Sequence, residues 1–270
     1  MVVQHNLSAM NTNRQLGTVQ NAQAKSTEKL SSGYRINRAG DDAAGLTISE
    51  KMRSQIKGLD KASANAQDGI SLIQTAEGAL NETHSILQRM NELATQAAND
   101  TNTTTDRGAI SSEINQLSGE INRIQSTTQF NTMNLLTGDF TSKNLQIGSL
   151  AGQTITINIS QMSASKLGVS NLSVSSGTNA GKAMSNIQKA INLVSNQRST
   201  LGALQNRLEH TINNLNTTSE NTQSAESRIR DVDMASEMVQ YSKNNILSQA
   251  GQSMLAQANK STQGVLSLLG

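Results

Sequence analysis

The clearest pattern in this sequence is a regular spacing of apolar residues between residues 184 and 215. The positions follow one another in alternating steps of three and four: Met184, Ile187, Ile191, Val194, Arg198, Leu201, Gln205, Leu208, Ile212 and Leu215. This spacing is the a/d pattern of a coiled-coil seam, and it predicts a long helix that needs a partner helix to bury its stripe. Arg198 and Gln205 are polar seam residues, which typically fix the register of pairing at a cost in stability.

Two further series upstream supply candidate partner helices. One runs through Ile73, Ala76, Leu80, Thr83, Leu87, Met90, Ala94 and Ala97, and the other through Ile110, Ile114, Leu117, Ile121 and Ile124. The polar residues 99–108 between them predict a loop or turn. Because this connection is short, the two helices are expected to pack as antiparallel neighbours.

Weaker helical patterns occupy both ends of the chain. Residues 6–31 and 42–58 each predict a helix, and the apolar series of the first is sparse. The end of the chain mirrors it with Val232, Ala235, Val239, Ile246, Ala250 and Met254, followed by Val265, Leu266, Leu268 and Leu269.

The middle of the chain, residues 139–181, is rich in Gly, Ser and Thr and loses the helical period. Residues 154–159 alternate polar and apolar side chains, which predicts a half-buried strand. Residues 145–147 precede it, with residues 148–152 as the turn, so a small β-hairpin is expected. The predicted fold is therefore mainly α, a long coiled-coil helical bundle with a small central β-hairpin region.

Composition favours thin, extended helices over a thick globule. The 270 residues include 1% aromatic side chains and no Trp, although aromatics bury the most area per residue. A net charge of +2 gives no strong field for nucleic acid or membrane surfaces. There is no Cys for a disulfide or a thiolate metal site, and no Pro to break a helix. No cleaved signal peptide and no membrane span are expected.

Candidate chemistry is sparse. His5, His84 and His210 have no partners at a metal-ligand spacing and are expected to be solvated helix residues. Residues 177–182 resemble a phosphate loop but have one residue too few between the glycines, and they are interpreted as a flexible turn before a helix starting near Ala180.

Two acidic clusters have both a functional and a structural interpretation. Asp41 and Asp42 could bind a cation or form a catalytic pair, but capping of the following helix is favoured. Asp231 and Asp233 lie beside Arg228 and Arg230, which favours a salt-bridged helix start over a substrate site. No catalytic, cofactor-binding or metal-binding residue is assigned, and no enzymatic activity is expected.

Several long motifs, in order along the chain, resemble the bacterial flagellins. They are Leu30-Ser-Ser-Gly-Tyr-Arg-Ile-Asn-Arg-Ala-Gly-Asp-Asp-Ala-Ala-Gly45, Asn65-Ala-Gln-Asp-Gly-Ile70, Thr75-Ala-Glu-Gly-Ala-Leu80, Gln88-Arg-Met-Asn-Glu-Leu-Ala94, Thr128-Gln-Phe-Asn131, Ser227-Arg-Ile-Arg-Asp-Val-Asp-Met-Ala235 and Val265-Leu-Ser-Leu-Leu269. The resemblance covers essentially all the helical parts. Two positions depart from the family pattern, Thr132 where a glycine is common and Gly270 where a basic residue is usual.

The resemblance implies a subunit of the flagellar filament with paired N- and C-terminal helices. Three regions are expected: a terminal coiled coil of 1–42 with 228–270, a helical bundle of 43–138 with 182–227, and a small insertion at 139–181. The seam at 184–215 should be covered mostly within the chain, by the helices at 73–97 and 110–124. The weaker terminal stripes should need neighbouring subunits, so an isolated monomer is expected to have frayed ends.

Partners and location also follow from the resemblance. The chain is expected to be exported through the flagellar type III apparatus, without a cleaved signal, to an extracellular filament built from copies of itself. Expected partners are a flagellin export chaperone at the C-terminal segment, the filament cap and the hook-junction proteins. A hook–filament junction protein is the alternative function, and an enzyme or a membrane-active coiled coil is a third hypothesis.

The resemblance carries over one binding surface. In flagellins sensed by vertebrate innate immunity, a Toll-like receptor engages the helical bundle, and the matching positions are Gln88, Arg89, Glu92, Leu93, Gln96 and Glu113. Arg89 and Leu93 are four residues apart and outside the 73–97 series, so both are expected to face outward. The same face could instead serve only subunit packing.

Overall fold

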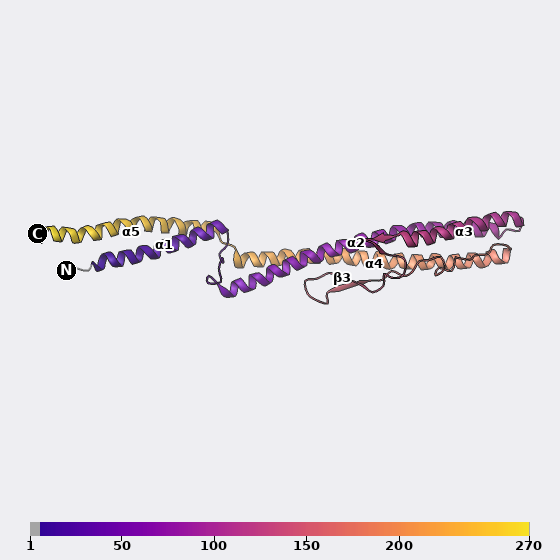
Figure 1. Ribbon diagram of the computed structural model, residues 1–270, viewed down its shortest axis with the longest axis horizontal. Coiled ribbons are helices and arrows are strands. Elements are labelled where there is room, and N and C mark those ends of the chain that lie inside the picture. Colours follow the sequence, from indigo (N-terminus) through magenta and orange to yellow (C-terminus); the bar gives the residue numbers. More distant parts are fainter. Residues whose placement is uncertain (1–5, 270) are drawn as a thin grey trace. The chain divides into compact units, whose positions relative to one another are not determined.

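The computed structural model describes residues 6–269, with side chains described as far as residue 261. Within this part, five helices and two small antiparallel hairpins are formed (Figure 1). The elements are α1 Leu7–Ser32, α2 Ala43–Ala97, α3 Thr104–Thr127, β1 Gln129–Phe130, β2 Met133–Asn134, β3 Lys143–Gln146, β4 Thr154–Ile157, α4 Gly177–Arg230 and α5 Met234–Leu269. The prediction of a mainly helical chain with a small central hairpin is confirmed.

The contacts within the chain define two compact units. Unit 1 contains the residues up to Ser54 and those from Asn221 onward, and unit 2 is Gln55–Glu220. The division of the chain into three regions stays a prediction. His5 and Gly270 lie outside the described residues, as do the side chains of the four apolar residues at 265–269.

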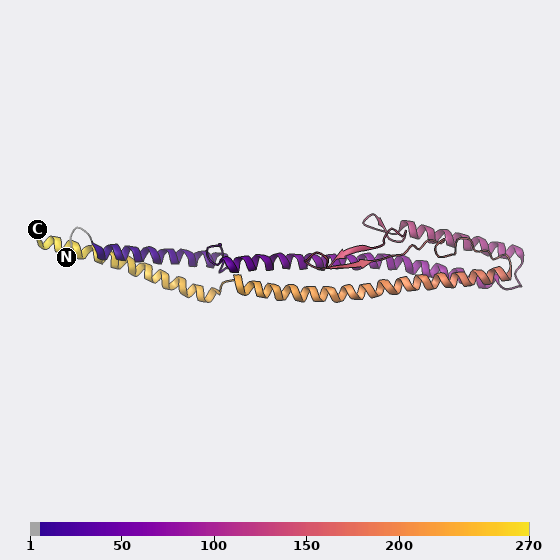
Figure 2. The same ribbon diagram turned by 90° about the horizontal axis from the view of Figure 1, so that it is seen from below.

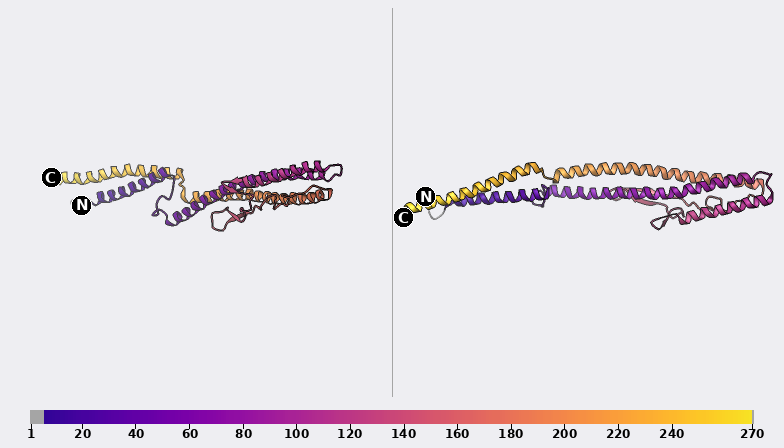
Figure 3. Two further views of the ribbon diagram at one scale, coloured as in Figure 1. Left: turned by 45° about the vertical axis from the view of Figure 1, so that its right-hand side comes forward. Right: turned by 90° about the horizontal axis from the view of Figure 1, so that it is seen from above.

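In unit 1 the first and last helices pair in antiparallel orientation, as Figures 1 and 3 show. The Asn6 side-chain amide donates to the Ala258 carbonyl at 3.0 Å near one end of the pair. Lys29 and Glu237 form an ion pair of 3.7 Å near the other end. The helix α1 ends where Gly33 adopts a left-handed conformation with φ +74°, a C-terminal cap that glycine accepts without steric cost. The expected pairing of the N- and C-terminal helices is confirmed.

The connectors that follow α1 and α4 also pair within unit 1. Tyr34 and Asp231 form an antiparallel β-bridge, and the Arg35 N–H donates to the Arg230 carbonyl at 2.7 Å. The Arg230 guanidinium lies 4.6 Å from the centre of the Tyr34 ring and 3.2 Å from a Glu50 carboxylate oxygen. These contacts hold the two non-helical stretches of unit 1 together.

Both acidic clusters cap helices. The Asp42 carboxylate accepts the Gly45 N–H at 2.8 Å, and Asp233 accepts the N–H of Ala235 at 3.0 Å. The predicted capping of the helix after Asp42 is confirmed. The predicted ion pairs between Arg228 or Arg230 and the two aspartates at 231 and 233 are wrong, because Arg230 reaches across to Glu50 instead.

Unit 2 is built on α2 and α4, which run antiparallel, with α3 folded back beside α2 (Figure 2). All eight residues of the predicted 73–97 series are buried, and in α4 every second seam residue is buried: Ile187, Val194, Leu201, Leu208 and Leu215. The alternate seam positions, including Arg198 and Gln205, are half-buried. The seam is therefore confirmed, and its cover comes from within the chain. At its end, however, Leu215 packs on Leu59 and Ala62 of α2, which lie before the expected 73–97 segment.

Three helix boundaries differ from the expected ones. The pieces expected at 42–58 and 73–97 belong to one continuous helix, α2, because residues 59–72 also bury an apolar face. The loop expected to reach Gly108 ends at Thr103, whose hydroxyl accepts the Asp106 N–H in a capping box that starts α3. Residues 177–182, expected to be a flexible turn, form the first turns of α4.

The predicted hairpin is β3–β4, in which Lys143 pairs with Ile157 and Gln146 with Thr154. Its buried face carries Ile155 and Ile157, as the alternation predicts. The hairpin lies along α2, where the Asn65 side-chain amide donates to the Gln146 carbonyl at 3.1 Å. The shorter β1–β2 hairpin was not expected, since strands of two residues leave no periodic signal.

Candidate functional site

The residues of the expected receptor-binding surface, on α2 and α3, are centred on one arginine. Arg89 on α2 donates through Nε and Nη2 to the same Glu113 carboxylate oxygen on α3, at 3.1 and 3.0 Å. Its Nη1 donates to Glu92, one turn further along α2, at 3.1 Å. These two carboxylates raise the pKa of the Arg89 guanidinium above its ordinary value, the Glu92 hydrogen bond being the largest cause. The side chains are solvent-exposed, so the triad is a charged surface patch that also ties α2 to α3.

Two glutamines extend this patch along α2. Gln88 and Gln96 are both exposed, and the Gln88 amide lies 3.1 Å from Nε2 of His84. The α2–α3 patch, meaning Gln88, Arg89, Glu92, Gln96 and Glu113, therefore combines one cation, two carboxylates and two amides on an open face. Such a surface can hydrogen-bond a polar partner.

Leu93 does not belong to the open face, and the expectation that it points outward is wrong. Its side chain is 2% exposed and packs in the main core of unit 2. The physical reason is that α2 is covered on more than one side, by α3, α4 and the segment after α3. The buried stripe is consequently wider than a single a/d seam and includes adjacent residues such as Leu93 and Ala94.

The α1–α5 pair of unit 1 has an unusual distribution of side chains. Among its side chains up to residue 261, the buried positions are few and mostly small or polar: Leu16, Ser26, Asn244 and Ser248. Gly251 belongs to the same side of α5, where an added Cβ would lie 3.2 Å from the Leu16 side chain. Small residues let two helix backbones approach closely, but they bury little apolar area.

Several large apolar residues among the described side chains of these two helices point away from the seam. Val239, Ile246 and Met254 on α5 are 70%, 67% and 63% exposed, and Leu7 and Met10 on α1 are similarly open. The sequence series through Val239, Ile246 and Met254 therefore marks an outward face and not the contact with α1. The actual contact could have been found from the small and polar residues 244, 248 and 251, which follow one another in steps of four and three. An exposed apolar stripe of this kind marks an interaction surface.

No group of three or more His, Asp or Glu side chains with the geometry of a metal site occurs among the described residues. None of the helices in the described part combines the length and apolar character of a membrane span. Two exposed surfaces of the described structure are candidates for function, namely the α2–α3 patch and the outward apolar face of α1 and α5.

The architecture defines a class: helical coiled-coil proteins in which the first and last helices pair and the intervening helices form a bundle. Comparison with known proteins places the chain within that class. The bacterial flagellin N-terminal helical region matches residues 3–141, and the bacterial flagellin C-terminal helical region matches residues 184–269. The chain belongs to the bacterial flagellin family.

Individual relatives agree with this assignment. A flagellin of Halalkalibacterium halodurans is 56% identical over 271 residues, with 100% of each chain covered. A flagellin of Bacillus subtilis is 52% identical over 304 residues, again with 100% of each chain covered. The crystal structure of Bacillus cereus flagellin is similar to 56% of this chain and 88% of its own, with a TM-score of 0.51 and 32% identity.

Proposed function

We propose that this chain is a structural subunit that polymerises into the bacterial flagellar filament and serves motility, and that it has no enzymatic activity. The observation that carries the proposal is the outward apolar face of the α1–α5 pair, whose described buried positions are mostly small or polar. Full-length similarity to flagellins supports it.

The energetics favour covering this face with other copies. Burying a valine, isoleucine or methionine side chain contributes about 1.5–3 kcal/mol relative to leaving it exposed. On α5, Val239, Ile246 and Met254 are mostly exposed in the single chain, so most of this burial free energy is gained only when another molecule covers them. Copies packed side by side through this face would bury it, and the terminal helices would gain most of their order from assembly. An isolated monomer would then have frayed ends and a folded unit 2.

The experiment compares two single substitutions on α5. Ile246→Asp places a charge in the apolar face, whereas Gln252→Asp places the same charge at an exposed polar position of the same helix. Filaments of each variant are counted by electron microscopy, and the fraction of polymerised protein is measured by sedimentation. Ile246→Asp is expected to abolish polymerisation while Gln252→Asp retains it. Normal filaments from Ile246→Asp would contradict the proposal.

We infer that the chain acts outside the cell, in the flagellum, after export without a cleaved signal. The open face of α5 would need cover before export, which suits a flagellin export chaperone that grips the C-terminal segment. The filament cap and the hook-junction proteins would contact the same terminal helices during growth. Calorimetric titration of a flagellin chaperone with the full chain and with a chain ending at Asp233 tests this. Equal affinity for both would contradict a C-terminal chaperone site.

We further propose that the α2–α3 patch binds the flagellin-sensing Toll-like receptor of a vertebrate host. Its exposed Arg89, flanked by carboxylates and amides, offers charge and hydrogen-bonding groups to a polar receptor surface. Leu93 would contribute by supporting the helix face from beneath, since it is buried.

A hook–filament junction protein is the alternative. Such a protein would bind hook ends without extending seeds, so mixing the purified chain with filament seeds separates the two functions. Elongation of the seeds is expected, because the chain matches flagellins over their full length.

A further inference from the structure

Methionine is the sulfur-containing residue of this chain, which has ten methionines and no cysteine. Oxidation of a thioether gives a sulfoxide, which turns a flexible apolar side chain into a polar one. The oxidant must reach the sulfur, so exposed methionines react before buried ones. Because no thiol competes for the oxidant, sulfur oxidation in this chain takes place first at its exposed methionines.

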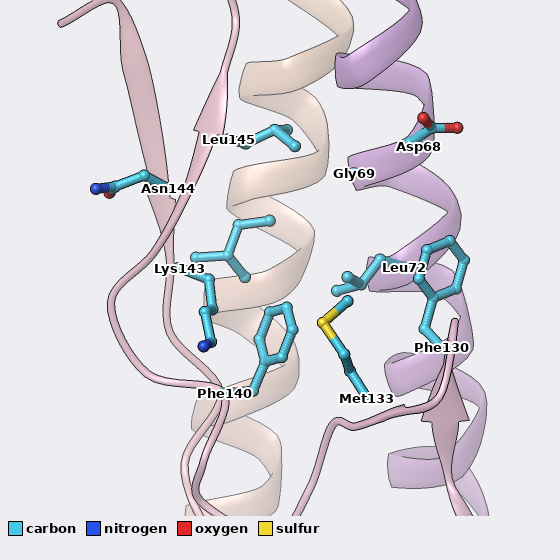
Figure 4. A pocket seen from close by; sticks show the side chains of 10 residues that line it. Asp68, Gly69, Leu72, Phe130, Met133, Phe140, Lys143, Asn144 and Leu145 are labelled. Atoms are coloured by element: carbon cyan, nitrogen blue, oxygen red, sulfur yellow. The ribbon is translucent and has the colours of Figure 1, made fainter.

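The exposed methionines are concentrated on the two terminal helices. Among residues 6–261, five methionines are exposed, and four of them lie on α1 and α5: Met10, Met234, Met238 and Met254. The fifth, Met133 of β2, is 42% exposed and lines an apolar pocket of unit 2 with Leu72 and Phe140 (Figure 4). Met90 and Met162 are buried in the core of unit 2. Most of the accessible sulfur among the described side chains therefore lies in unit 1.

Three of these methionines lie on the outward apolar face of α1 and α5. Met10 and Met254 are 64% and 63% exposed, and Met238 is 51% exposed. Met238 lines an open hollow on α5 together with Val239 and Ile246, so its thioether is part of the same apolar surface. These three residues, called the face methionines, are accessible to a small oxidant in the free subunit.

Oxidation would change how well this face packs against another copy. A thioether is apolar and adapts its shape to an apolar neighbour. A sulfoxide oxygen accepts hydrogen bonds, and Val239 and Ile246, which line the same hollow as Met238, have no side-chain donor. Burying a polar group without a hydrogen-bond partner is costly, so covering an oxidised face is less favourable than covering the native one.

We infer that Met10, Met238 and Met254 form an oxidation site that controls assembly. A hydroperoxide converts their thioethers to sulfoxides in the free subunit, and the oxidised subunit then joins the filament less readily. Subunits within a filament are protected, because neighbouring copies cover this face. The inference rests on the proposed filament function and adds a chemical control to it.

The reaction is balanced with hydrogen peroxide as the oxidant. The sulfur lone pair forms an S–O bond with one peroxide oxygen while the O–O bond breaks, so the sulfur loses two electrons and the peroxide gains two. The departing hydroxide takes up the proton released by the transferred oxygen and leaves as water. Methionine sulfoxide reductases reverse the change: two thiols become a disulfide, the sulfoxide oxygen leaves as water, and the thioether is restored.

Partial oxidation of the wild-type chain tests the site without any substitution. Monomers are treated with hydrogen peroxide until each exposed methionine is oxidised in a fraction of the molecules, and they are then polymerised and sedimented. Mass spectrometry of peptides gives the sulfoxide fraction at each methionine in the pellet and in the supernatant. At the face methionines this fraction is expected to be about tenfold or more higher in the supernatant. At Met133, the internal control, it should be equal in both.

Two results of this experiment would overturn the inference. One is an equal sulfoxide fraction in pellet and supernatant at the face methionines. The other is a difference at Met133 as large as theirs, because oxidation would then impair the chain in general. Failure of the untreated chain to form filaments would instead overturn the proposed function.

Substitution provides an independent test. A triple variant with Met10→Leu, Met238→Leu and Met254→Leu keeps an apolar face of similar volume without thioethers. After complete peroxide treatment this variant is expected to polymerise, whereas the wild type and the control variant Met133→Leu are not. Reduction of the oxidised wild type by sulfoxide reductase should restore its filaments. A treated triple variant that fails as completely as the wild type, or a wild type that stays inactive once its sulfoxides are reduced, would contradict the face methionines as the cause.

Discussion

Arg89 of α2 and Glu113 of α3, 24 residues apart in sequence, form a two-pronged contact in which Nε and Nη2 donate to one carboxylate oxygen at 3.1 and 3.0 Å. The pair joins two helices and remains exposed to solvent. Removing this pair should therefore lower the affinity for the proposed receptor more than it lowers the stability of the fold.

Arg89→Ala is expected to weaken receptor binding about tenfold, since truncation of an interface arginine commonly has an effect of that size. Surface plasmon resonance with the receptor ectodomain measures this, and circular dichroism should show unchanged helicity. Arg123→Ala is the matched control, because Arg123 is an exposed arginine on α3 with its own partner, Glu120. Unchanged affinity for Arg89→Ala would remove Arg89 from the proposed surface.

Leu208→Ala should destabilise unit 2 strongly. Leu208 is fully buried in the α4 seam, so the substitution loses buried area and leaves a cavity, at a cost of about 2–5 kcal/mol in the free energy of unfolding. Urea unfolding followed by circular dichroism measures the change. Arg207→Ala, at the exposed neighbouring position, should stay within about 0.5 kcal/mol. Similar effects for both would mean that the seam does not stabilise the monomer.

Two glycines of α2 should respond in opposite ways to alanine. At Gly58 the new Cβ would lie 2.7 Å from the Ser149 Cβ and 3.2 Å from its Cα, so the hairpin tip must shift, costing about 1–3 kcal/mol. At Gly78 nothing lies within 4 Å, and Gly78→Ala should stabilise by about 0.5–1 kcal/mol through helix propensity. Thermal unfolding of both variants measures this. A stabilised Gly58→Ala would show that the tip does not pack on α2.

The start of α3 should lose stability in acid. The Thr103 hydroxyl and N–H both donate to the Asp106 carboxylate, at 2.7 and 2.9 Å, and hold its pKa below the ordinary value of 3.8. A carboxyl group whose pKa is lower in the folded state than in the unfolded state stabilises the fold at pH values above its unfolded-state pKa. That contribution is lost as the pH falls through the folded pKa.

The urea midpoint of the wild-type chain should therefore exceed that of Asp106→Asn near pH 7, and the difference should shrink as the pH falls below about 3.8. Asp139→Asn, at an exposed loop position, serves as the control. A difference that persists unchanged at pH 2.5 would contradict ionisation of Asp106 as its cause.

The local elements of this protein could be predicted from the sequence because their signals are local. Steps of three and four residues indicated the helices, and alternation at 154–159 indicated the β4 strand. The seam of α4 could also be predicted, because apolar residues such as Leu201 and Leu208 lie seven residues apart and each must be buried against a partner helix. The motifs resembling flagellins added the pairing of the first and last helices.

The faces that the helices bury were decided by the tertiary structure. Periodicity locates an apolar stripe on a helix but does not show how many neighbouring segments cover that helix. Leu93 lies outside the predicted stripe and is nevertheless buried, because α2 is covered on several sides. The same limit applies to α5, where Asn244 and Ser248 face α1 and Ile246 faces out. Close approach of two backbones favours small residues at the contact, and only the packed pair shows which side that is. The Arg89–Glu113 pair likewise exists because α3 folds back on α2.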